Sequence, residues 1–380
     1  MADRYFIDNE PALAARLDVF LGKLHRSLAD SPFAAQIVVL LLGGGYGRGE
    51  GGVYRGSEVE GAALYNDLEF YVVTTGLRTP EKLPEWCHHW AEEGHRETGI
   101  EVEFKILPAS ALRQGQSSMF YYDLVLGHRL VWGDEGFCAT LPESLSDPKL
   151  IPATEVTRLL FNRGTGLLFC REKLGENEAE MDSGFIERNH AKAWLALADA
   201  VLALNGRYHW SCQRRHSLLN EDLPLLPPDW PLLKKWHTSG VLFKLHPRHE
   251  FPGTPFLSQR QTEMTQVWLR TFLWAESVRL KRIWPEADAY ASDAARIFPE
   301  SSALKNVALR VRDRLRLGSR LPGLFDYPRA ALQRALVLLL GSPENDSAIW
   351  RRASSLLGIV PTSTPAVVMS AYRTWWQRYN

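Results

Sequence analysis

The stretch QIVVLLLGGGYGRGEGG (36–52), followed by LYNDLEFYVV (64–73), decides how the N-terminal part of this chain is expected to fold. The first stretch begins with a short apolar run that stops at glycines, a pattern typical of a buried strand that ends in a tight turn. In the second stretch, Leu68 and Phe70 would point to one face of a strand and the two acidic residues to the other. The pattern predicts two strands separated by a glycine-rich turn.

Further elements are predicted on both sides of this pair. The segment 100–107, IEVEFKIL, alternates so regularly that it predicts a third strand, with Glu101, Glu103 and Lys105 on one face. Apolar residues at helical spacing predict helices at 11–30 and 81–98. The insert 52–64, between the turn and the second strand, is interpreted as a loop that covers the glycine-rich turn and the acidic residues of the second strand.

Asp67 and Glu69 are two residues apart on a predicted strand, so their carboxylates point into the same space. Like charges this close repel each other, and a divalent cation between them relieves the repulsion. Magnesium prefers hard oxygen ligands, often carboxylates together with substrate phosphates. The turn offers backbone N–H groups at Gly44 and Gly45, and Arg48 follows as a cation that pairs with phosphate. These residues predict metal-assisted chemistry on a phosphate compound.

Three pieces of the sequence in this order, LGGGYGRGEGG (42–52), NDLEFYVV (66–73) and VEF (102–104), resemble the DNA polymerase β-like nucleotidyltransferase superfamily. The signature of that superfamily is a glycine turn, an Asp-x-Asp/Glu strand and a lone carboxylate on a later strand. Within it, the run GGYGRGE (44–50) is most similar to the motif of the bacterial uridylyltransferases that modify the nitrogen-regulatory protein. The resemblance covers residues 35–135 and implies a nucleotidyltransferase domain there.

The resemblance implies that Asp67, Glu69 and a third carboxylate hold two magnesium ions, with manganese as an alternative. Glu103 and Glu101 both remain open as the third carboxylate. The run EFKILPAS (103–110) fits the family pattern slightly better, so Glu103 is preferred and would also be the general base for the attacking hydroxyl.

The resemblance also implies nucleotide-binding residues. Gly44, Gly45 and Arg48 match the phosphate-binding turn, although many family members have a serine at the position of Gly45. Members with a helical second domain often place a lysine from it on the triphosphate. The segment NHAKAWLALADAVLALNGRYH (189–209) resembles that helix, which implies Lys192 as the lysine and Tyr208 as a contact to the base or a phosphate.

Beyond residue 152 the apolar period is helical almost throughout. We therefore predict an α+β fold: an N-terminal polymerase β-like nucleotidyltransferase domain with a small mixed sheet at 1–145, then an all-α domain at 146–380 that binds substrate or nucleotide. A further division near 285–300 is an alternative. Helices are expected at 153–174, 185–205, 262–283, 303–316, 329–340, 347–357 and 365–379.

The chain has 380 residues, with 44 basic and 44 acidic side chains, so net charge alone argues for no polyanionic partner. Residues 1–150 carry 13 Lys/Arg and 22 Asp/Glu, whereas residues 301–380 carry 12 and 4. The basic residues between 310 and 352 are interpreted either as a solvated helix face or as a contact to RNA. The four cysteines lack metal spacing, and neither a signal peptide nor a membrane span is visible, so a cytoplasmic protein without a membrane partner is expected.

The leading functional hypothesis is an enzyme that moves a nucleoside monophosphate from an NTP to a hydroxyl and releases pyrophosphate. The acceptor is expected to be a small molecule, a protein or an RNA 3′ end, in that order. One alternative is a non-catalytic NTP-binding regulatory module, and another is a nucleotidyltransferase of the toxin–antitoxin type.

Overall fold

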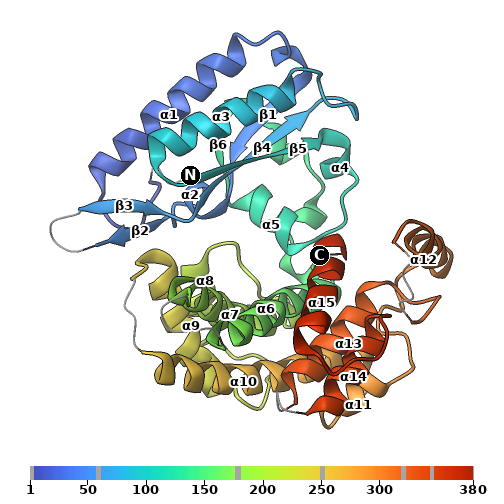
Figure 1. The fold of residues 1–380 in the computed structure, drawn as a ribbon. Helices are drawn as coiled ribbons and strands as arrows, with labels where there is room; N and C mark the ends of the chain where they lie inside the picture. The colour runs from blue at the N-terminus through green and yellow to red at the C-terminus, as the bar shows by residue number, and fades with distance from the viewer. Residues whose placement is uncertain are drawn as a thin grey trace. The chain divides into compact units, whose positions relative to one another are not determined.

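The computed structural model describes residues 4–56, 61–175, 181–248, 253–317, 322–342 and 346–379 (Figure 1). The chain is a mixed α+β protein, as predicted. Its strands are β1 (Ile37–Leu42), β2 (Gly52–Arg55), β3 (Ala62–Tyr65), β4 (Asp67–Thr74), β5 (Glu101–Pro108) and β6 (Arg129–Gly133). Its α-helices are α1 (Pro11–Ala29), α2 (Gly44–Gly47), α3 (Leu83–Thr98), α4 (Ala109–Arg113), α5 (Met119–Leu126), α6 (Ala153–Leu174), α7 (Ser183–Leu204), α8 (Cys212–Leu218), α9 (Trp230–Leu245), α10 (Thr254–Leu280), α11 (Ala287–Ser292), α12 (Ala303–Leu317), α13 (Arg329–Leu340), α14 (Ser347–Leu356) and α15 (Pro365–Tyr379).

The chain folds into two compact units. The first consists of Met1–Glu155, Val201–Leu225 and Lys234–Glu250. The second consists of Val156–Ala200, Leu226–Leu233 and Phe251–Asn380. These units differ from the predicted ranges 1–145 and 146–380, because three stretches of the predicted helical domain, 146–155, 201–225 and 234–250, group with the N-terminal residues.

The first unit contains a four-stranded mixed sheet with the strand order β5-β4-β1-β6. Strands β4 and β5 are parallel, whereas β1 pairs with β4 and β6 in the antiparallel direction. The predicted strands at 36–42, 64–73 and 100–107 are present as β1, β4 and β5, although β4 starts only after Asn66, which has a positive φ of 71°. The edge strand β6 was not predicted.

Alternation along the strands builds two apolar layers, one on each face of the sheet. On one face, Leu40, Leu68 and Phe70 pack with buried residues of α1 and α3. On the other face, Leu41 and Tyr71 pack with residues of α4 and α5. Figure 1 shows α1 and α3 on one side of the sheet and α4 and α5 on the other. The predicted orientation of Leu68 and Phe70, away from the acidic side chains, is confirmed.

The predicted loop at 52–64 is partly wrong. Its ends form the antiparallel hairpin β2–β3, in which Val53 pairs with Leu64 and both side chains are buried. Residues 57–60 lie outside the described residues. Short strands of four residues carry too little alternation to be read from the sequence alone.

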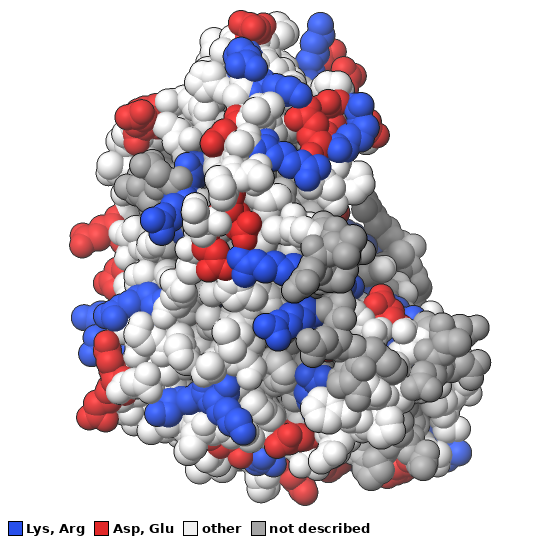
Figure 2. Space-filling view, turned by 90° about the vertical axis from the view of Figure 1, so that its left-hand side faces the viewer, with Lys and Arg blue, Asp and Glu red and all other residues white. Residues whose placement is uncertain are grey.

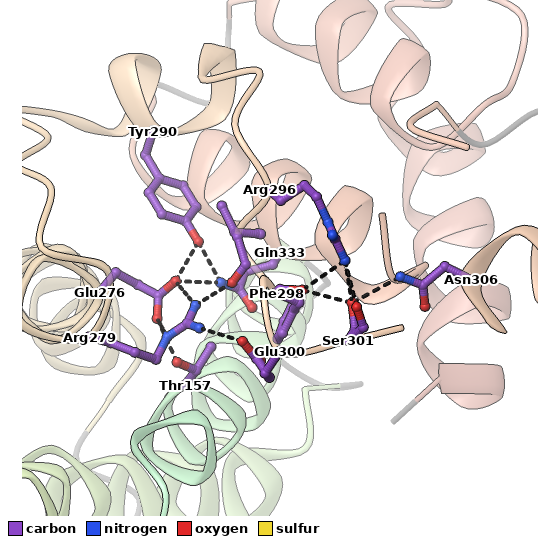
Figure 3. A network of polar contacts seen from close by, with 11 residues as sticks. Thr157, Glu276, Arg279, Tyr290, Arg296, Phe298, Glu300, Ser301, Asn306 and Gln333 are labelled. Atoms are coloured by element: carbon purple, nitrogen blue, oxygen red, sulfur yellow. Dashed lines mark hydrogen bonds and ion pairs between the residues drawn. The ribbon is translucent and has the colours of Figure 1, made fainter. Parts of the chain in front are cut away.

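Every element in the described part of the second unit is a helix. A buried polar network ties these helices together (Figure 3). The Glu276 carboxylate accepts hydrogen bonds from Arg279, Thr157, Tyr290 and Gln333. Because buried carboxylates need partners to offset lost hydration, this network fixes how α6, α10, α11 and α13 pack.

Among the residues that the structure describes, no helix is both long and apolar enough to cross a membrane. Figure 2 shows Lys and Arg side chains interspersed with Asp and Glu side chains on the face that it draws. All four cysteines are free thiols: Cys87, Cys138, Cys170 and Cys212.

Candidate functional site

Asp67, Glu69 and Glu103 come together on the sheet of the first unit. One carboxylate oxygen from each lies within 4.8 Å of the other two, and all three residues are half-buried. Asp67 and Glu69 are neighbours on one face of β4, and Glu103 projects from the adjacent strand β5. The structure thus places side by side the three residues that the sequence proposed as metal ligands.

The parallel register explains why Glu103 joins this group. Glu103 pairs with Glu69 across β4 and β5, whereas Glu101 pairs with Asp67, two residues nearer the start of both strands. Glu101 is exposed at the edge and is not part of the carboxylate group. The geometry therefore favours Glu103 between the two candidates that the sequence left open.

Lys105 brings a cation to these carboxylates. Its ammonium nitrogen donates a hydrogen bond of 3.2 Å to Glu69 and lies 3.3 Å from Glu103. Burial acts to lower the pKa of Lys105. The attraction of Glu69, together with that of its other partners, outweighs burial, so the pKa of Lys105 is raised. One side chain thus partly neutralises two carboxylates that repel each other.

The glycine-rich turn lies against the same carboxylates. Gly44 has a φ of +60°, and a Cβ atom there would come within 2.7 Å of Glu69 Oε2. The Gly43 N–H donates to the Glu69 carbonyl at 2.8 Å, which fixes the start of the turn beside β4. A Cβ on Gly45 would be 3.1 Å from the Glu50 carbonyl oxygen. Glycine at position 44 therefore keeps the backbone close to the acidic group.

A cavity of about 200 Å³ opens at this point. It is lined by Gly43, Gly44, Arg48, Glu69, Tyr71, Lys105, Phe120, Asp123 and Leu124. A second cavity of about 670 Å³ is lined by Leu41, Gly47, Arg48, Leu126, Gly127, His128, Arg129, Leu130, Asp134, Glu135, Cys138 and Trp210. Arg48 borders both cavities, so the larger space lies next to the carboxylate site.

Arg48 is held by a buried ion pair. Its Nη1 atom lies 2.9 Å from Asp123 Oδ2, and the Tyr208 hydroxyl donates to the same oxygen at 3.2 Å. Burial raises the pKa of Asp123 even though Arg48 and Arg215 act in the opposite direction. Asp123 Oδ1 and Arg48 Nε have no hydrogen-bond partner among the described residues. Such buried atoms beside a cavity can take up contacts from a ligand.

Glu50, from the same motif, is fully engaged within the first unit. Its carboxylate accepts hydrogen bonds from Ser211 Oγ at 2.6 Å, Cys212 N at 2.9 Å and Gln213 N at 3.2 Å. Burial acts to raise the pKa of Glu50, but Lys244 and these hydrogen bonds lower it to about 2. Glu50 thereby fixes the start of α8 against the glycine-rich turn.

The two nucleotide-binding residues expected from the helical segment have different surroundings. Tyr208 is buried, and its ring packs against Tyr122 and under the Arg215 guanidinium. This packing disfavours stacking on a base and gives Tyr208 a role in orienting Asp123. Lys192 lies in α7 within the second unit, and its nucleotide-binding role stays a prediction.

The basic stretch 310–352 lies in the second unit, except that residues 318–321 and 343–345 are outside the described residues. Arg310 is buried, Arg334 pairs with Asp326 at 3.4 Å, and Arg352 pairs with Asp288. Several of these cations thus have acidic partners within the chain. A contact between this stretch and RNA stays a prediction.

Sequence reasoning missed Asp123 and Arg215. Asp123 is the one charged residue of the apolar helix MFYYDLVL (119–126), and a lone acid in such a helix is a signal of a buried functional or structural contact. Arg215 gave no comparable signal, because its attraction to Asp123 depends on how segments that are distant in the chain fold together.

Comparison of the chain with models of known protein families gives no match. Comparison with curated proteins gives none either.

Proposed function

We propose that the first unit is a metal-dependent nucleotidyltransferase, which moves a nucleoside monophosphate from an NTP to a hydroxyl and releases pyrophosphate. The observation that carries this proposal is the convergence of Asp67, Glu69 and Glu103 within 4.8 Å beside the glycine-rich turn. The polymerase β-like family of the first unit and a helical partner domain in the second are part of the same proposal.

The residues present fit a magnesium site. Three carboxylates offer the hard oxygen ligands that magnesium prefers, and half-buried side chains leave room for water and phosphate ligands. When bound, two magnesium ions, or manganese in their place, would neutralise triphosphate charge and lower the pKa of the attacking hydroxyl. Asp67, Glu69 and Glu103 would hold the metal, and Lys105 would be released from them to contact phosphate.

The protein groups around the carboxylates suit a triphosphate. Gly44 and Gly45 bring the backbone close, and Arg48 and Lys105 line the same cavity as Glu69. Arg48 keeps its orientation through Asp123, so a phosphate would meet a guanidinium that is already positioned. Glu103 is 43% exposed and would accept the proton of the acceptor hydroxyl.

A small molecule is the acceptor that we place first. The cavity of about 670 Å³ that shares Arg48 with the carboxylate site has the size of small-molecule sites. A protein hydroxyl comes second and an RNA 3′ end third. Two alternatives remain: an NTP-binding regulatory module without catalysis, and a nucleotidyltransferase of the toxin–antitoxin type whose helical unit binds a protein.

The test uses the full chain, each of the four NTPs labelled at the α-phosphate, and magnesium. Small hydroxylated compounds, protein and RNA serve as acceptors in separate reactions, and pyrophosphate release is measured with label transfer. We expect magnesium-dependent transfer that Asp67→Ala abolishes and that Asp30→Ala, at an exposed aspartate after α1, leaves unchanged. Magnesium-dependent NTP binding without transfer would favour the regulatory module, and an absence of NTP binding would refute the proposal.

A further inference from the structure

Helix α12 of the second unit exposes its apolar side. Leu304 is 84% exposed, Leu315 is 81% exposed and Val311 is 46% exposed, and Ala308 between them is exposed as well. Figure 1 shows α12 to one side of α13, α14 and α15. A row of large apolar side chains in water is unfavourable, and such rows mark interaction sites.

The opposite side of α12 is polar, and this side faces the protein. Asn306 donates hydrogen bonds of 2.9 Å to Ser301 Oγ and to the Phe325 carbonyl, and Figure 3 shows the contact to Ser301. Farther along the helix, Asp313 is fully buried and pairs with Arg378. The helix is therefore held by its polar residues, and its outward orientation is built into the fold.

The exposed apolar residues follow the spacing of a coiled coil. Leu304, Ala308, Val311 and Leu315 are separated by four, three and four residues, which is the a/d repeat of a heptad. The polar anchors Asn306 and Asp313 fall at the f positions, on the far side from this row. The exposed side of α12 thus has the pattern that packs against a second helix.

Three of the four e and g positions that flank this row are basic, and Val307 occupies the fourth. Lys305 and Arg312 occupy the e positions and Arg314 a g position, and all three are exposed. Charges at e and g decide which helices pair in a coiled coil. Two copies of α12 would bring like charges together, whereas glutamates on a partner helix would pair with these cations.

We propose that α12 is a docking site for an amphipathic helix of another protein, with apolar residues at its a and d positions and acidic residues at its e and g positions. Packing against such a helix covers Leu304, Val311 and Leu315 and places carboxylates beside Lys305, Arg312 and Arg314. This inference does not depend on the proposed nucleotidyltransferase activity.

The test uses the full chain and a fluorescein-labelled synthetic peptide of about three heptads, with leucine at a and d and glutamate at e and g. A second peptide has lysine in place of each glutamate. Fluorescence anisotropy should show that the chain binds the acidic peptide about tenfold or more tightly than the basic peptide, because only the acidic peptide complements the flanking cations.

Two sets of variants separate the apolar and charged contributions. Leu315→Glu should weaken binding of the acidic peptide by about tenfold or more, since it places a charge in the packed row. The double variant Arg312→Glu/Arg314→Glu should reverse the preference toward the basic peptide. The control is Val360→Glu, which changes a valine that is 82% exposed elsewhere in the same unit and should have no effect on binding. Unchanged circular dichroism shows that each variant is folded.

Four results would overturn this inference. Equal binding of the two peptides would show that the cations beside the apolar row do not select an acidic partner. Weak binding that Leu315→Glu leaves unchanged would show that the apolar row is not the surface that binds the peptide. A dimer of the full chain that Leu315→Glu dissociates would show that a second copy covers this row. Binding of an RNA oligonucleotide or of anionic phosphatidylserine vesicles to α12, without binding of the acidic peptide, would assign the surface to those ligands instead.

Discussion

The carboxylates of Glu276 and Glu69 lie in contrasting environments, one in each unit of the chain. Glu276 is fully buried and accepts hydrogen bonds from four side chains. One of these side chains, Arg279, donates two hydrogen bonds from its guanidinium group. Glu69 lies within 4.8 Å of two other carboxylates, and it shares the Lys105 ammonium with Glu103. The first environment satisfies one negative charge, whereas the second concentrates three.

This difference separates a structural charge from a functional one. A buried carboxylate surrounded by donors is stabilised in place, and nothing further is needed to explain it. Three neighbouring carboxylates repel one another, so the fold tolerates a local cost that a bound cation would relieve. The contrast supports a cation site at Asp67, Glu69 and Glu103 more than the acidic residue types alone would.

The largest effect should follow from breaking the satisfied network. Glu276→Gln leaves the buried Arg279 guanidinium without its nearest ion-pair partner, since Glu300 lies farther away at 3.7 Å. Removing one member of a buried pair costs about 3–5 kcal/mol of unfolding free energy. Urea unfolding of the second unit measures this loss. The matched control is Glu263→Gln, an exposed glutamate on the same helix α10, which should change stability by about 0.5 kcal/mol or less. Equal stability of the two variants would show that the hydrogen bonds and ion pairs of Glu276 do not hold the second unit together.

A second prediction sharpens the comparison within the first unit, where Glu50 is satisfied like Glu276. The pKa of Glu50 is lowered from 4.5 to about 2 in the folded state, so its contribution to stability is present above pH about 4.5 and is lost as the pH falls toward 2. Glu50→Gln should cost on the order of 2–3 kcal/mol at pH 7.

The difference between the wild-type chain and Glu50→Gln should narrow steadily as the pH falls below about 4.5. Denaturant midpoints at a series of pH values provide the measurement, with Glu81→Gln, at an exposed glutamate, as the control. A difference that is independent of pH would show that the carboxylate charge is not what holds the start of α8.

Much of the fold could be predicted from the sequence where a period was long enough to read. The alternation in β5 and the helical spacing in α1 identified both elements within one or two residues. Helix α9 was missed because Pro231 follows a proline-rich stretch, yet a proline in the first turn of a helix is tolerated. The edge strand β6 was missed because its five residues are nearly all half-buried and show no alternation.

For the candidate site, sequence reasoning identified the residues that belong to the three pieces of the family motif. Gly44 lies in the first piece and Asp67 and Glu69 in the second, and the resemblance gave the preference for Glu103 in the third. The Arg48–Asp123 ion pair and the Glu50 contacts to the start of α8 depend on contacts between segments that are far apart in the chain. Local sequence patterns carry no information about such pairings. A buried arginine needs an acidic partner, but the sequence around the arginine does not show which acidic residue this is.

The third prediction tests whether the crowded carboxylates do chemistry. Glu103→Gln should lower turnover by about two orders of magnitude or more, with NTP affinity changed much less, because it removes the proposed general base. Glu101→Gln should lower turnover by less than about tenfold, since Glu101 is exposed outside the carboxylate group. Steady-state kinetics of both variants with each NTP show which of the two glutamates is needed for turnover. A dead Glu101→Gln and an active Glu103→Gln would reverse the assignment of the third carboxylate.

The smallest effect concerns Lys105, the cation that Glu69 and Glu103 share. Lys105→Met removes the ammonium and leaves the carboxylates to repel each other, so the chain without added metal should lose about 0.5–1 kcal/mol of stability. The side chain of Lys105 is 43% exposed, and solvent screening keeps this loss small. Lys82→Met, at an exposed lysine just before α3, is the control and should leave stability unchanged.

Added magnesium should then affect the two proteins differently. In the wild-type chain a bound divalent cation must displace the Lys105 ammonium, whereas in Lys105→Met it meets carboxylates that carry their full repulsion. Magnesium should therefore raise the Tm of Lys105→Met more than that of the wild-type chain, because ligand binding stabilises the folded state in proportion to its affinity. Thermal melts over a series of magnesium concentrations measure both shifts. If magnesium stabilises the variant no more than the wild-type chain, Asp67, Glu69 and Glu103 do not hold a divalent cation, and the crowding of their charges would need a different explanation.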